Sequence, residues 1–136
     1  MYGEVSVGIV RKEENGEVRY LLVQSVKDFT GAAAQDARAY YPPGGHLEEG
    51  ETKEEALSRE LDEELKLEVI VARYLCSSPS DVAGEKVHWF DCEVVSTEFE
   101  VQKSDVKSAN YFTKEEIKDL LLWPATRKFL DLYLRD

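Results

Sequence analysis

Apolar residues recur along the chain in short β-rich runs that are separated by polar, turn-forming segments. Two such runs occupy residues 5–10 and 18–26, with Asn-Gly at residues 15–16 between them. Asn-Gly between two β-rich runs is the strongest short-range signal for a hairpin, since both residues tolerate a positive φ. Two further β-rich runs follow at residues 67–77 and 86–95. The pattern therefore predicts a hairpin near the amino end and two strands later in the chain.

Helical periodicity begins at Thr52. Thr52 and Glu55 have the spacing of a capping box, in which the threonine side chain accepts a backbone N–H and the glutamate side chain reaches back. Leu57, Leu61 and Leu65 follow at intervals of four and share one face of a helix. The sequence therefore predicts a central helix with a buried stripe of leucines.

Two shorter helices are expected towards the carboxyl end. Thr113 and Glu116 repeat the capping-box spacing, and Pro124 is a favourable first-turn residue for a last helix. Residues 27–41 have no clear period and are predicted to form a long loop, a kind of segment that is often functional. Without an internal repeat or linker, the chain is expected to be one mixed α/β domain (α+β) over residues 1–136, with strands before and after the central helix.

Composition and charge narrow the class of function. Of the 136 residues 43% are hydrophobic and 33% are charged, as in a globular domain. The net charge of −11 argues against a surface of Lys and Arg that holds a nucleic-acid polymer. A small phosphate-bearing substrate is still compatible with this charge if a metal cation supplies the positive charge.

The sequence predicts neither a membrane-spanning helix nor a signal peptide. No apolar run approaches the roughly 18 residues of a membrane helix, and the amino end has no basic region followed by an apolar stretch. Cys76 and Cys92 are too few and too far apart for a disulfide framework or a structural zinc site. The expectation is a cytoplasmic protein with no membrane partner, either a monomer or a homodimer.

Three carboxylates share one face of the predicted central helix. Glu63 and Glu64 lie three and four positions after Glu60, and Arg59 can pair with Glu63 at i+4. Like charges at this spacing destabilise an isolated helix by about 0.2–0.5 kcal/mol per pair. A divalent cation among them would explain the cluster, since Mg²⁺ prefers carboxylate and carbonyl oxygens. The alternative is a solvated acidic face.

These carboxylates belong to a longer motif. Gly45 and Glu51 lead into the run Arg-Glu-Leu-Asp-Glu-Glu-Leu-Lys-Leu at residues 59–67, and this arrangement resembles the Nudix box of the Nudix hydrolase family. Eight of the nine defining positions match, and the exception is Lys66, where the family usually has Gly. The late helix start at residues 111–117 is also similar to the family. The resemblance implies a Nudix-like mixed β-sheet sandwiched between helices.

The same resemblance implies an enzyme that uses Mg²⁺ or Mn²⁺. Such a hydrolase cleaves a diphosphate bond in a nucleoside diphosphate linked to another group, by attack of water at phosphorus, and a nucleoside triphosphate or another small nucleotide is the favoured substrate. By position in the motif, Glu60 and Glu64 would be metal ligands, Glu63 a further or water-mediated ligand, and the carbonyl of Gly44 a backbone ligand. A nucleotide-sensing module that keeps the fold without catalysis is the alternative.

Other motif positions would support the site. Glu51 and Arg59 resemble the pair that braces the loop against the helix, next to the glycine turn at Gly45. A carboxylate must also accept the proton of the attacking water. Glu60 and Glu63 are candidates, and so is an acid outside the motif such as Asp105, with Glu98 and Glu100 as nearby alternatives.

Four side chains are candidates for contact with the substrate. Phe29, Tyr40 and Tyr41 lie in or beside the long predicted loop, and an aromatic ring can stack on a nucleobase. His46 follows the glycine pair and could contact a phosphate, with a role in packing the loop as the alternative.

Overall fold

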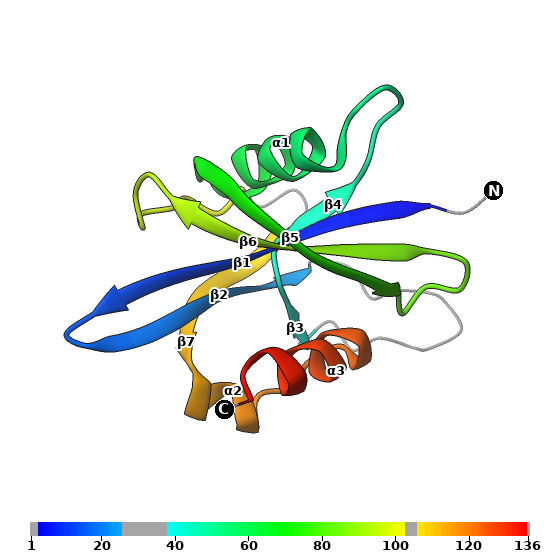
Figure 1. Ribbon diagram of the computed structural model, residues 1–136. Helices are drawn as coiled ribbons and strands as arrows, with labels where there is room; N and C mark the ends of the chain where they lie inside the picture. The colour runs from blue at the N-terminus through cyan, green and yellow to red at the C-terminus, as the bar shows by residue number, and fades with distance from the viewer. Residues whose placement is uncertain (1–2, 26–37, 103–105, 136) are drawn as a thin grey trace.

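The computed structural model describes residues 3–25, 38–102 and 106–135 (Figure 1). None of the helices in these ranges is long and apolar enough to cross a membrane. In chain order the elements are β1 (Glu4–Glu14), β2 (Glu17–Ser25), β3 (Tyr40–Tyr41), β4 (Gly44–His46), α1 (Lys53–Leu65), β5 (Val69–Pro79), β6 (Lys86–Val94), β7 (Val106–Thr113), α2 (Lys114–Asp119) and α3 (Pro124–Tyr133).

The predicted hairpin is confirmed as the β1–β2 connection. Asn15 has a φ of 55° and Gly16 a φ of 78°, which is the pair of positive values that a tight two-residue turn needs. Glu14 and Glu17 are the last paired residues on either side of it. The local preference of Asn-Gly therefore sets the register of both strands.

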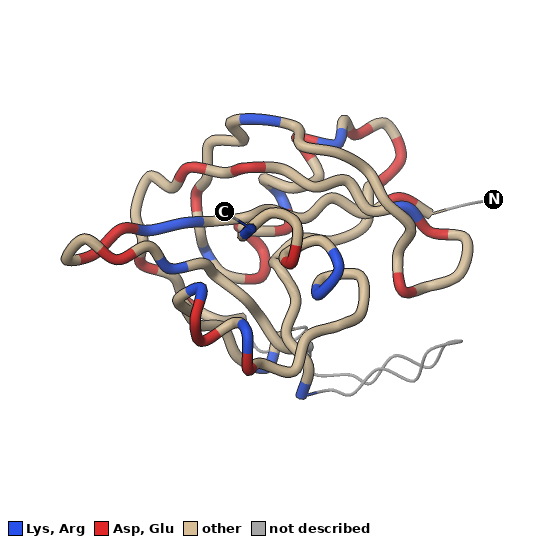
Figure 2. The backbone as a smooth tube through the Cα atoms, turned by 60° about the horizontal axis from the view of Figure 1, so that its bottom comes forward, with Lys and Arg blue, Asp and Glu red and all other residues tan. Residues whose placement is uncertain are grey.

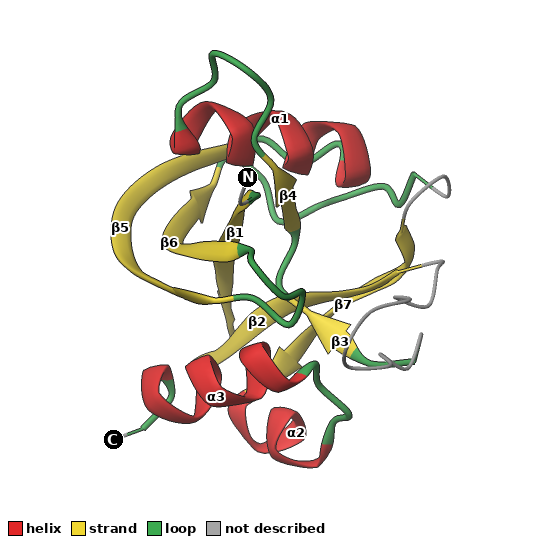
Figure 3. Cartoon of the chain, turned by 90° about the vertical axis from the view of Figure 1, so that its right-hand side faces the viewer, coloured by secondary structure: helices red, strands yellow, loops and turns green. Residues whose placement is uncertain are grey.

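Strand β1 connects the two parts of a mixed sheet. Its first half pairs antiparallel with β4 and parallel with β6, and its second half pairs antiparallel with β2. The path β3-β2-β1-β6-β5 is extended by β7, which pairs with β2. Figure 3 shows α1 on one face of this sheet and α2 with α3 on the other. The prediction of a mixed sheet between helices is therefore confirmed.

The helix starts are also confirmed. Thr52 Oγ1 accepts the Glu55 N–H at 3.1 Å while Glu55 Oε1 accepts the Thr52 N–H at 2.9 Å, and Thr113 with Glu116 forms the same box at the start of α2. Pro124 opens α3. Each box satisfies backbone donors that a helix end would otherwise leave unpaired.

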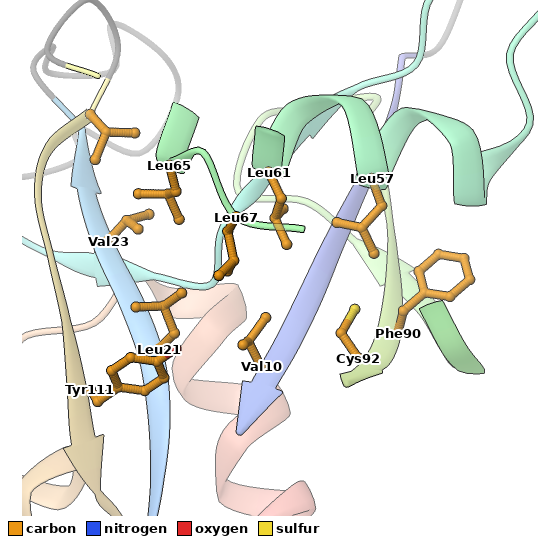
Figure 4. Close-up of a cluster of buried hydrophobic side chains, with 11 residues drawn as sticks. Val10, Leu21, Val23, Leu57, Leu61, Leu65, Leu67, Phe90, Cys92 and Tyr111 are labelled. Atoms are coloured by element: carbon orange, nitrogen blue, oxygen red, sulfur yellow. The ribbon is translucent and has the colours of Figure 1, made fainter. Parts of the chain in front are cut away.

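The predicted leucine stripe joins α1 to the sheet (Figure 4). Leu57, Leu61 and Leu65 are completely buried and point towards residues of β1, β2 and β6, among them Val10 and Phe90. Loss of one such leucine side chain typically costs about 2–5 kcal/mol. The stripe therefore fixes where the polar face of α1 lies.

A second cluster packs α2 and α3 against the opposite face of the sheet. Side chains alternate along each strand, so Ile9 and Trp89 belong to this cluster while Val10 and Phe90 belong to the first. Trp89 also stacks on Phe129 of α3, with ring centroids 4.0 Å apart and planes 1° from parallel. The central strands are therefore buried on both faces.

Three predicted boundaries are wrong. The strand expected at residues 5–10 is β1 at Glu4–Glu14. The strand expected at residues 67–77 is β5 at Val69–Pro79, because the helix end uses the Lys66 and Leu67 N–H groups, which donate to Asp62 and Leu61. Tyr40–Tyr41, expected in the long loop, forms β3 and pairs with β2. Residues 26–37, which include most of that loop, lie outside the described residues.

Lys66 ends α1 in the left-handed conformation, with φ 51° and ψ 35°. A side chain in this region costs about 1–2 kcal/mol relative to glycine, which has no Cβ. We therefore expect Lys66→Gly to raise the free energy of unfolding by about 1 kcal/mol, measured by urea denaturation. Lys66→Ala removes the same charge and keeps the Cβ, so equal stability of the Gly and Ala variants would contradict this account.

Candidate active site

A cavity of about 320 Å³ extends from α1 past the sheet to α3. On the α1 side its lining is Glu60, Glu64 and the β4 residues. On the α3 side it is the first residues of that helix and the loop between β5 and β6. Among the described residues, those that line it are Val5, Val7, Tyr41, Pro42, Gly44, Gly45, His46, Glu60, Glu64, Ser80, Asp81, Val82, Glu85, Val87, Trp89, Trp123, Ala125 and Thr126.

The Gly44–Gly45 turn lets the β4 backbone and the Glu60 carboxylate approach each other closely. Gly44 has a φ of +155°, and a Cβ there would lie 2.7 Å from Val7 Cα and still closer to the Ser6 carbonyl oxygen. A Cβ on Gly45 would lie 2.8 Å from Glu60 Oε1 and closer to the other carboxyl atoms. Only glycine leaves room for the Glu60 carboxylate to lie against the β4 backbone.

Arg59 donates hydrogen bonds to three carboxylates, and that of Glu48 lies 3.6 Å from its Nη1. Its Nε and Nη2 donate to the two oxygens of Glu51 at 2.6 and 3.0 Å, and its Nη1 donates to Glu60 and Glu63, each at 2.9 Å. Nη2 also donates to the His46 carbonyl at 3.0 Å, which ties α1 to β4. The planar, bidentate pair with Glu51 is a strong form of ion pair. Arg59 therefore orients Glu60 at the cavity wall.

This ion pair lowers the pKa of Glu51. The hydrogen bond from Arg59 is the main cause, and the Glu48 N–H, which donates to Glu51 Oε1 at 2.8 Å, adds to it. The hydrogen bonds of Arg59 to Glu51, Glu60 and Glu63, with that to Glu51 first, raise the pKa of Arg59 further above its usual value. A carboxylate whose pKa is lowered by folding stabilises the protein above its unfolded pKa, and this stabilisation is lost as the pH falls through the folded value.

We expect Arg59→Gln to return the pKa of Glu51 towards its usual value of 4.5. Carboxyl ¹³C NMR titration measures the pKa directly. Urea denaturation at pH 7 and pH 3 should show that the stability lost in the variant is larger at pH 7, since protonation of Glu51 weakens the ion pair of the wild type in acid. Arg135→Gln, at an exposed position, is the charge-matched control. An equal loss at both pH values would contradict the assignment.

The three predicted metal carboxylates do not all lie in the cavity. Glu60 and Glu64 line it, whereas Glu63 lies outside the lining, is half exposed and accepts from Arg59. Within the described ranges, no three His, Cys, Asp or Glu side chains lie close enough to hold a metal ion alone. The oxygen donors at hand are two carboxylates and the glycine-turn backbone. Mg²⁺ is commonly held by one or two carboxylates together with substrate phosphates, so this set fits it.

The candidate substrate-binding residues also differ in whether they line the cavity. Tyr41 lines the cavity, and its ring centroid lies 4.8 Å from that of Trp123. The ring of Tyr40 instead packs edge-on against Phe112 at 5.0 Å, away from the lining. His46 lines the cavity, with Nε2 2.6 Å from Glu85 Oε2. Phe29 and Asp105 lie outside the described residues.

Sequence reasoning missed the α3 side of the cavity. Asp81 and Glu85 come from the loop between β5 and β6, and Trp123 and Thr126 come from the start of α3. Burial raises the pKa of Asp81, while a hydrogen bond from the Ala125 N–H to its Oδ1 at 2.9 Å acts in the opposite direction. An acid in a Ser/Pro/Asp/Gly loop and an aromatic residue before a helix are common features, so neither signals a site until the fold joins them.

Comparison of the sequence with known proteins identifies a family and individual relatives. The NUDIX domain family model matches residues 3–133. The chain is 33% identical over 87 residues to human NAD-capped RNA hydrolase NUDT12, covering 60% of this chain and 19% of that protein, so it spans about a fifth of this relative's length. It is 30% identical over 91 residues to the CTP pyrophosphohydrolase of Escherichia coli K12, covering 67% of each.

Solved structures share the fold over almost the whole chain. The solution structure of the E. coli ORF135 protein has a TM-score of 0.71 and 26% identity, covering 98% of this chain and 89% of that one. The NUDIX domain of Shewanella oneidensis NrtR, complexed with ADP ribose, has a TM-score of 0.80 over 98% of this chain and 87% of that one. At 14% identity, this second likeness concerns the fold alone.

Proposed function

The chain belongs to the NUDIX domain family, and we propose that it is a hydrolase that cleaves the diphosphate bond of a nucleoside triphosphate or a related small nucleotide with Mg²⁺ or Mn²⁺. One observation carries the proposal. Glu60 and Glu64 line the same cavity as the glycine-turn backbone, and Arg59 orients Glu60 there. Acidic oxygens beside bare backbone are suited to a metal-bound diphosphate.

The charge of the cavity supports dependence on a metal. Its described lining holds four acidic residues, Glu60, Glu64, Asp81 and Glu85, and neither Lys nor Arg. Figure 2 shows acidic residues spread over the described chain with Lys and Arg among them. A bare polyphosphate would be repelled by four carboxylates. When bound, a divalent cation would neutralise the diphosphate and lower the pKa of a water molecule.

Side chains of the cavity lining are suited to bind and orient the nucleotide. Tyr41 and Trp123 offer aromatic surface on which a base can stack, worth about 1–3 kcal/mol per base. Glu60, Glu63 and Asp105 stay candidates for the residue that accepts the proton of the attacking water. The CTP named for the E. coli relative supports a nucleotide substrate. The cytoplasmic location and the choice between monomer and homodimer stay predictions.

A hydrolysis screen tests the proposal. The full chain would be incubated with Mg²⁺, Mn²⁺ or EDTA and with nucleoside triphosphates, oxidised deoxynucleotides, ADP-ribose, nucleotide sugars, dinucleoside polyphosphates and NAD-capped RNA, with products resolved by chromatography. We expect metal-dependent release of a nucleoside monophosphate from one of the small nucleotides. If NAD-capped RNA alone were cleaved, the substrate would be a capped RNA and not a small nucleotide. Nucleotide binding without any cleavage would instead support the nucleotide-sensing module.

A further inference from the structure

The proposed cleavage of a diphosphate bond gives no role to the carboxylate of Asp81. It lines the same cavity as Glu60 and Glu64 but is attached to the opposite side, through the hydrogen bond from the Ala125 N–H to its Oδ1. Helix α1, which carries Glu60 and Glu64, and helix α3, whose Ala125 N–H binds Asp81, lie on opposite faces of the sheet (Figure 3). A nucleotide whose phosphates are held near α1 would therefore place another part of the molecule near Asp81.

The surroundings of Asp81 favour a flat, apolar-faced group. Trp89 and Val87 of β6 line the cavity together with Trp123, and Trp89 is held by its stack on Phe129. A carboxylate among such side chains is costly unless hydrogen bonds compensate for its lost hydration. In the described part of the chain, the bond from Ala125 is the one hydrogen bond of this carboxylate. An ionised carboxylate can accept about four, so it has capacity for donors from a ligand.

The donor must come from the substrate's base or sugar, since phosphate oxygens only accept. A nucleobase has flat apolar faces for Trp123 and the neighbouring Tyr41, and its edge carries N–H groups. An exocyclic amino group points away from the ring, with hydrogens in the plane of the base. A carboxylate oxygen in the same plane can accept one of them, as Asp and Glu do from the amino group of cytosine.

We propose that Asp81 selects the base: it accepts a hydrogen bond from an exocyclic amino group, so the cavity prefers an amino-bearing nucleobase to its oxo counterpart. An oxo group at the same place would bring two acceptors together and leave the carboxylate without a partner. This inference rests on the proposed function only in taking a nucleotide as the ligand. A well-formed contact of this type discriminates about tenfold or more between matched bases.

Two substrate pairs test the proposal, because CTP and UTP, like ATP and ITP, differ by amino against oxo at one exocyclic position. The adjacent ring nitrogen changes with it, from an acceptor in the amino member to an N–H donor in the oxo member. For each pair, kcat/KM would be measured in the wild type, in Asp81→Asn and in Asp119→Asn, an exposed acid of α2 that serves as the charge-matched control. We expect at least one pair to show about a tenfold preference for the amino member in the wild type and the control. In Asp81→Asn that ratio should fall to near one or invert, since an amide can donate to an oxo group.

Other outcomes overturn the proposal. A wild type without any amino preference does so, and this result does not depend on whether a variant folds. An unchanged ratio in a folded Asp81→Asn variant also does so. The rate with dCTP would be measured as well. If Asp81→Asn changes only the ratio of CTP to dCTP, Asp81 contacts the ribose, and the proposal is overturned.

A binding arm separates this proposal from the proposed function. Calorimetric affinities of the wild type and Asp81→Asn for CMP against UMP, and for AMP against IMP, decide the role of Asp81 without turnover. If no nucleotide is cleaved, the hydrolase proposal fails while an amino preference that Asp81→Asn removes still supports base selection. Absence of binding to all four monophosphates, or binding without an amino preference, overturns it.

Discussion

Glu64→Gln is expected to reduce metal-dependent nucleotide hydrolysis about a hundredfold or more while leaving the fold intact. Glu64 lines the cavity one helical turn from Glu60. Replacing a residue one step removed from a metal ion typically costs 10–100-fold, so loss of Glu64, which we propose as a direct ligand, should cost more. Glutamine keeps the shape of the side chain and removes its charge. The effect should therefore appear in kcat and in the Mg²⁺ concentration needed for half-maximal rate.

Glu54→Gln provides the matched control for this prediction. Glu54 lies in the first turn of the same helix and is exposed, so the substitution changes the charge of α1 equally, away from the cavity. The control should hydrolyse nucleotides at close to the wild-type rate. Circular dichroism and urea denaturation would establish that both variants fold. If the two variants had the same activity, Glu64 would have no special role in holding the metal.

Gly44→Ala is expected to destabilise the protein by about 3 kcal/mol or more, from backbone strain and overpacking together. Gly44 combines a φ of +155° with a Cβ position that meets the Ser6 carbonyl oxygen and Val7 Cα. Those atoms belong to the backbone of β1, which is paired with β4 there and with β6 on its other side. They cannot move aside as the end of a side chain could. Relief requires β4 to separate from β1, which would also displace the turn that Glu60 lies against.

Gly50→Ala separates the two contributions. Gly50 has a similar need for a positive φ, +85°, but a Cβ there would meet nothing within 4 Å among the described atoms. Its substitution should cost only the backbone strain, about 1–2 kcal/mol. Urea denaturation of both variants and the wild type gives the comparison. Equal losses would contradict the proposed contact between the glycine turn and β1.

The sequence by itself determined the features that depend on neighbours in the chain. Asn15 and Gly16 favour their turn through their own backbone preferences, and Thr52 reaches Glu55 because the two are separated by a single helical turn. The leucine stripe follows from the 3.6-residue period alone. The spacing of Glu51 from Arg59 also carried the resemblance to the family, and the two side chains do pair.

The tertiary structure alone decided which of the predicted site residues share a cavity. Periodicity puts Glu60, Glu63 and Glu64 on one helix face, but the guanidinium of Arg59 binds Glu63 outside the cavity lining. Tyr40 and Tyr41 are neighbours, yet a strand points them to opposite sides, so only Tyr41 lines the cavity. Asp81 reaches the site because its loop meets the start of α3, 44 positions away in sequence. Contacts at that separation depend on how the layers pack, which no local pattern encodes.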